Sequence, residues 1–273
     1  LRCAGRELHF MDWGPRDGRA VVAWHGLART GRDMDPLAAH LAARGWRVVC
    51  PDTIGRGLSE WSPDPHNEYC LDFYEQLAES LVDQLGLHRR AWVGTSMGGA
   101  IGLVAAARSL RGRITRLVLN DMGPEITQSS QQRIRSYAGN PAAFATMTEL
   151  ERYFRAIYAP YGYLPDEQWR ALAESSVRRL PDGRVTPHYD PAMVQQFEHH
   201  PEDYVRWAEY DSLAIPVLCL RGADSDLLAA ETGVQMAQRG PRARVVTIAG
   251  VGHAPALNVQ EQLDLVTGFL EEG

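Results

Sequence analysis

The stretch AWVGTSMGGAIGLVAAA, residues 91–107, joins a short apolar run to a helix-forming run of small residues. Gly94, Ser96 and Gly98 form a G-x-S-x-G motif at the junction of the two runs. A serine on a sharp strand-to-helix turn has a strained backbone, and tiny neighbours two residues away on each side avoid a clash. We therefore predict that Ser96 is a nucleophile, raised above a sheet edge at the positive end of a helix.

Short apolar runs alternate with helix-period segments on both sides of this motif. Strands are predicted at residues 7–13, 20–24, 46–50, 91–94, 116–120, 215–222 and 243–250. Helices are predicted at residues 34–44, 70–85, 97–110 and 259–270. Asn258 and Glu261 are the predicted N-cap and N3 partner of the last helix. The alternation predicts an α/β fold with a mostly parallel, doubly wound sheet.

The alternation stops over residues 122–212, where no strong strand run is found and prolines break several helical segments. This part holds 13 of the 23 aromatic residues, either because a thin helical layer needs rings to pack or because rings line a pocket. We predict a core domain of residues 1–121 and 213–273 with a helical lid of residues 122–212 inserted between two late strands. The predicted pocket residues of the lid are Tyr153, Tyr158, Tyr161 and Trp207.

Composition removes several functional classes. The 28 basic residues are all arginine, which excludes Schiff-base chemistry, lysine-anchored pyridoxal phosphate and a P-loop within this chain. The net charge of -6 disfavours nucleic acid and anionic lipid as partners. Because no metal-ligand or dinucleotide motif is present and no apolar run reaches about 18 residues, we expect no metal, no cofactor and no membrane span. A cytoplasmic protein acting on a small molecule is expected, with its oligomeric state open.

The serine turn is similar to that of the α/β-hydrolase superfamily, especially its lidded esterases, enol-lactonases, perhydrolases and carbon–carbon bond hydrolases. Three further motifs match this group, each after a predicted strand: the stretch HGL at 25–27, the turn at 51–59 and the pair GH at 252–253. The resemblance implies the α/β-hydrolase fold, with His253 as the base that takes the proton of Ser96. It also implies backbone N–H groups of Leu27 and Met97 as an oxyanion hole, with His25 supporting that loop near the substrate.

An aspartate should orient the protonated imidazole. In the resembling family it lies three residues after the glycine that ends the penultimate strand, a position that Ser225 occupies here. We favour Asp226, with Asp224 as the second choice and Asp121, after the strand at 116–120, as the third.

These motifs together predict a carboxylic ester hydrolase that cleaves a small ester or lactone through an acyl-enzyme on Ser96. The enzymatic alternatives are carbon–carbon cleavage of vinylogous diketones, perhydrolysis and hydrolysis of hydroxyalkanoate oligomers. Carbon–carbon cleavage is weakened because Ala254, rather than the tryptophan common in those enzymes, follows His253. The alternative outside enzymes is a hydrolase-like small-molecule receptor.

Overall fold

The computed structural model describes residues 1–272, apart from the side chains of residues 128, 129, 133 and 137. Its centre is a seven-stranded sheet in the order β11-β10-β7-β6-β4-β5-β3, and β3 alone runs antiparallel to its neighbour. The strands are β3 (Phe10–Trp13), β4 (Arg19–Trp24), β5 (Trp46–Pro51), β6 (Arg90–Thr95), β7 (Ile114–Asn120), β10 (Val217–Gly222) and β11 (Arg244–Ile248). The predicted α/β fold with a mostly parallel sheet is confirmed.

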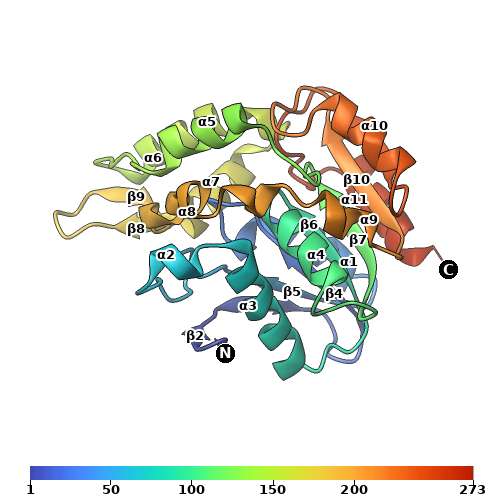
Figure 1. The fold of residues 1–273 in the computed structure, drawn as a ribbon. Coiled ribbons are helices and arrows are strands. Elements are labelled where there is room, and N and C mark those ends of the chain that lie inside the picture. Colours follow the sequence, from blue (N-terminus) through green and yellow to red (C-terminus); the bar gives the residue numbers. More distant parts are fainter. Residues whose placement is uncertain (273) are drawn as a thin grey trace.

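Helices cover both faces of this sheet (Figure 1). One face packs against α1 (Asp35–Ala42) and α11 (Gln260–Glu271). The other packs against α3 (Leu71–Gln84), α4 (Met97–Ala107) and α10 (Ala230–Gln238). No helix in the described part of the chain is long and apolar enough to cross a membrane.

The central strands have apolar side chains on both faces. In β4, Val21 and Ala23 belong to the core under α1 and α11, whereas Val22 and Trp24 belong to the core under α3 and α4. Trp24 stacks on Trp92 of β6 with ring centroids 5.3 Å apart. Because successive strand residues point to opposite faces, an unbroken apolar run is what a strand between two helical layers requires.

The segment between β7 and β10, called the inserted segment below, comprises helices and one small hairpin. Its helices are α5 (Gln128–Ala138), α6 (Met147–Ile157), α7 (Asp166–Ser175), α8 (Gln196–His199) and α9 (Trp207–Asp211), with short turns η2 (Ala159–Tyr161) and η4 (Pro201–Tyr204). The hairpin of β8 (Val177–Arg179) and β9 (Val185–Pro187) was not predicted, because strands of three residues are too short for a periodic signal. The hairpin projects at the left of Figure 1.

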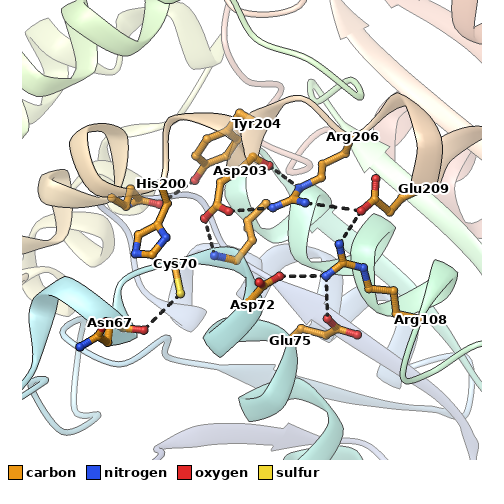
Figure 2. A network of polar contacts seen from close by, with 12 residues as sticks. Asn67, Cys70, Asp72, Glu75, Arg108, His200, Asp203, Tyr204, Arg206 and Glu209 are labelled. Atoms are coloured by element: carbon orange, nitrogen blue, oxygen red, sulfur yellow. Dashed lines mark hydrogen bonds and ion pairs between the residues drawn. The ribbon is translucent and has the colours of Figure 1, made fainter.

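A chain of polar contacts joins the end of the inserted segment to α3 and α4 (Figure 2). Asp203 accepts a hydrogen bond from the backbone N–H of Leu71 at 2.7 Å, where α3 begins. Arg206 pairs with Asp203 at 2.7 Å and with Glu209, and Glu209 in turn pairs with Arg108 just after α4 at 2.6 Å. These contacts fix α9 against the helical layer that carries the Ser96 turn.

The predicted N-cap of the last helix is wrong. The N-cap residue of α11 is Val259, and no side chain caps this helix. The side-chain amide of Asn258 instead donates to the carbonyl oxygen of Tyr163 at 2.9 Å and to Gln168 at 2.6 Å. Asn258 therefore links the core to the inserted segment.

Two glycines in helices should respond in opposite ways to alanine. A Cβ at Gly98 would overlap the backbone carbonyl of Trp24, so Gly98→Ala should lower the free energy of unfolding by about 1–3 kcal/mol or more. A Cβ at Gly268 in α11 meets open space, so Gly268→Ala should raise the free energy of unfolding by about 1 kcal/mol. Urea unfolding measures both changes, and similar effects of the two substitutions would contradict this packing.

Candidate active site

Ser96 lies on the tight turn between β6 and α4, as the G-x-S-x-G motif predicted. Its φ of 51° and ψ of -118° lie outside the usual regions for a residue with a side chain. A Cβ at Gly94 would overlap the backbone of Gly98, and a Cβ at Gly98 would overlap Trp24, so the turn requires both glycines. The backbone N–H of Ser96 donates to the carbonyl of Asn120 at 3.0 Å, which ties the turn to β7.

Three side chains that follow β6, β7 and β11 form a continuous hydrogen-bonded chain. The Ser96 hydroxyl lies 2.9 Å from Nε2 of His253, and Nδ1 of His253 lies 2.6 Å from Oδ2 of Asp121. The Asp121 carboxylate can only accept, so Nδ1 donates to it and Nε2 is left to accept the hydroxyl proton. The geometry thus joins the predicted pair of Ser96 and His253, with the histidine in the tautomer that a base requires.

The preference for Asp226 as the partner of His253 is wrong, as is the second choice, Asp224. Both residues are exposed and line the cavity described below, whereas Asp121, the third choice, contacts the imidazole. The reason is the parallel register of the sheet. Asn120 pairs with Leu220, so the residue after β7 lies beside the end of β10, within reach of the loop that carries His253.

Asp121 is fully buried, and its carboxylate accepts two further hydrogen bonds from residues at and just after the end of β10. Its Oδ1 accepts the backbone N–H of Gly222 at 2.8 Å, and its Oδ2 accepts the hydroxyl of Ser225 at 2.6 Å. Ser225, at the position where the resembling family carries its acid, therefore donates a hydrogen bond to the acid instead. Such bonds stabilise the ionised carboxylate inside the protein.

Two backbone N–H groups are predicted to bind an oxyanion. Those of Leu27 and Met97 donate to no group among the residues that the structure describes. The buried guanidinium of Arg56 holds both residues, because it donates to the carbonyl of Leu27 at 2.9 Å and contacts the sulfur of Met97 at 3.6 Å. Sequence reasoning missed this role, and the only available signal was an arginine between two glycines in the turn at 51–59.

His25 supports the loop that carries Leu27. Its ring is completely buried, Nδ1 donates to the carbonyl of Gly26 at 2.6 Å, and Nε2 accepts the backbone N–H of Thr53 at 2.9 Å. Burial lowers the pKa of His25 to about 4, so the ring is neutral near pH 7.

A cavity of about 370 Å³, called the catalytic cavity below, lies over Ser96 and His253. The inserted segment supplies part of its wall, including Tyr158 and Tyr161. The other two predicted pocket residues do not line this cavity. Tyr153 packs against Phe144, and Trp207 packs edge-on against Tyr210 with Arg239 over its ring. Among the described residues, no group of three or more acidic, histidine or cysteine side chains could hold a metal ion.

Comparison with known proteins agrees with this architecture. The family model of the alpha/beta hydrolase fold matches residues 19–258. The chain belongs to the α/β-hydrolase family. It is 37% identical to the 3-hydroxybutyrate-oligomer hydrolase of Cupriavidus necator, over 96% of this chain and 92% of that protein.

Two further comparisons extend this. An alpha/beta hydrolase of Novosphingobium aromaticivorans has a crystal structure that superposes with a TM-score of 0.87 and 35% identity, over 99% of this chain and 96% of that one. The non-heme chloroperoxidase of Burkholderia pyrrocinia is 26% identical over 86% of each chain. This chain therefore shares its fold with the Novosphingobium protein, and the relative from Cupriavidus necator is a hydrolase.

The buried, neutral His25 makes stability depend on pH. An unfolded chain binds a proton at this histidine below about pH 6.5, whereas the folded protein resists protonation until about pH 4. The contribution of His25 is thus fully present above pH 6.5 and is lost as the pH falls toward 4, by up to about 1.4 kcal/mol per pH unit. Urea unfolding from pH 7 to pH 4.5 should give a steeper loss for the wild type than for His25→Gln. Parallel pH profiles would contradict this environment for His25.

Proposed function

We propose that the chain is a serine ester hydrolase whose natural substrates are short oligoesters of hydroxy acids. The observation that carries the proposal is the hydrogen-bonded chain from Ser96 through His253 to Asp121 at the wall of the catalytic cavity. Serine is a weak nucleophile at neutral pH, so a base must lie within hydrogen-bond distance of its hydroxyl to accept the proton. A further group must stabilise the cation that the protonated base becomes.

In the first half-reaction, Nε2 of His253 takes the hydroxyl proton as the Ser96 oxygen attacks the ester carbonyl carbon. The buried Asp121 carboxylate stabilises the imidazolium, and the carbonyl oxygen, now negative, accepts the N–H groups of Leu27 and Met97. The intermediate then collapses, and the bond to the alcohol oxygen breaks. The imidazolium returns its proton to that oxygen, which leaves an alcohol and an acyl-enzyme on Ser96.

In the second half-reaction, water takes the place of the alcohol. His253 accepts a proton from the water as its oxygen attacks the acyl carbon, and the same two N–H groups hold the new oxyanion. Collapse breaks the bond to the Ser96 oxygen, which regains the proton from His253. The products are a carboxylic acid and the free enzyme.

The substrate class is supported by similarity and by the form of the cavity. The relative from Cupriavidus necator, with 37% identity over nearly all of both chains, is a 3-hydroxybutyrate-oligomer hydrolase. In this proposal the inserted segment is a lid, since Tyr158, Pro160 and Tyr161 form part of the wall of the catalytic cavity. A cavity of about 370 Å³ suits small flexible esters better than a polymer surface.

A fluorophosphonate probe and the dimer and trimer of 3-hydroxybutyrate test this function together. The wild type should form one adduct at Ser96, found by peptide mass spectrometry, and should release 3-hydroxybutyrate from both oligomers. Ser96→Ala should lose the adduct and at least about 10³-fold in kcat, because the nucleophile is absent.

Ser80→Ala is the matched control, because Ser80 lies on α3 and contacts Gln84 instead of the site. It should behave as the wild type. No adduct on the wild type would refute the nucleophile, and an adduct without cleavage of either oligomer would refute the substrate class.

A further inference from the structure

A second cavity of about 230 Å³, called the side cavity below, adjoins the catalytic cavity. Its own walls are mainly apolar and include Leu164 and Leu172 from the inserted segment and Pro255 from the loop after His253. Arg29 and Tyr161 line both cavities. Arg29 therefore lies at the boundary between the cavity over Ser96 and the side cavity.

Arg29 is buried and only partly paired. The residue is 3% exposed, and its Nε and Nη2 each donate to the Asp33 carboxylate at 2.6 Å. The Tyr158 ring packs over the guanidinium, 4.7 Å from its carbon. Nη1 is enclosed and has no hydrogen-bond partner among the described residues. Leaving a charged donor buried without a partner is costly, so each such group in a native protein needs an explanation, and a bound ligand is one explanation for a donor at a cavity wall.

The other charges around the two cavities leave Arg29 as the favourable position for an anion. Asp224 and Asp226 line the catalytic cavity, where Arg29 is the one arginine among the described lining residues. Asp33 and Asp35 also line the side cavity, and each is paired with an arginine: Asp33 with Arg29 at 2.6 Å, and Asp35 with Arg32 at 2.5 Å. Nη1 of Arg29 is therefore the one cationic donor in the described walls of the two cavities that is buried and has no partner.

We propose that Arg29 binds the free terminal carboxylate of the substrate through Nη1, and that the side cavity holds the hydroxy-acid unit that carries it. The inference rests on the proposed function and sharpens it: the preferred substrates are acidic oligoesters, cleaved at the ester next to the carboxylate end. Arginine suits this role because its planar guanidinium stays charged and offers donors in a fixed geometry.

Two dimers of 3-hydroxybutyrate that differ in one group test the inference. One ends in the free carboxylate and the other in a primary amide, which is similar in shape and neutral. The wild type should cleave the carboxylate dimer with a kcat/KM about 10- to 100-fold higher, mostly through KM, because a hydrogen bond to a charged partner is lost in the amide. This comparison needs no substitution, so it does not depend on the folding of a variant.

Variants then assign the preference to Arg29. Arg29→Leu combined with Asp33→Asn, which leaves no unpaired charge, should reduce the ratio of the two kcat/KM values to about one or below. Arg47→Leu combined with Asp12→Asn, the matched control, removes a similar two-bond Arg–Asp pair outside both cavities and should keep the wild-type ratio. Equal cleavage of both dimers by the wild type, or an unchanged ratio without Arg29, overturns this inference alone. If neither dimer is cleaved, the proposed function fails and this inference fails with it.

Discussion

The architecture of the site depends on one buried carboxylate, that of Asp121, held between the ends of β7 and β10. An ionised carboxylate with no exposed surface is stable only when several donors surround it. Here the donors are the backbone of Gly222, the hydroxyl of Ser225 and the imidazole of His253. The bonds from Gly222 and Ser225 hold the Asp121 carboxylate, and the bond from His253 holds the histidine ring with its other nitrogen facing Ser96. The contacts that surround the buried Asp121 carboxylate therefore also orient His253.

The second constraint is the close approach of backbone segments around Ser96. The turn at Ser96 exists because Gly94 and Gly98 let β6, α4 and the end of β4 touch without side chains between them. Leu27 follows β4 and Met97 begins α4, and the buried Arg56 contacts both residues. The neutral His25 also supports the loop that carries Leu27, without adding a charge there.

The strands, the turn at Ser96 and the pairing of Ser96 with His253 could be predicted because each depends on local sequence: apolar runs, a glycine spacing and a loop after a strand. The aspartate that contacts His253 could not be predicted in this way. Asp226 and Asp224 lie next to the expected position in the chain, but the choice of Asp121 depends on the register between β7 and β10, which no local pattern encodes. The aromatic residues of the inserted segment show the same limit. Composition indicated many rings, yet only packing decides that Tyr158 lines the cavity while Trp207 lies against Tyr210.

The most direct test of the account compares kcat for Asp121→Asn and Asp226→Asn on the same 3-hydroxybutyrate dimer. The amide of the first variant removes the charge behind His253 and disturbs its tautomer, so kcat should fall by about 10⁴-fold. The second variant changes an exposed side chain at the cavity wall and should stay within a few-fold of the wild type. A large loss in Asp226→Asn with near-normal turnover in Asp121→Asn would contradict the account.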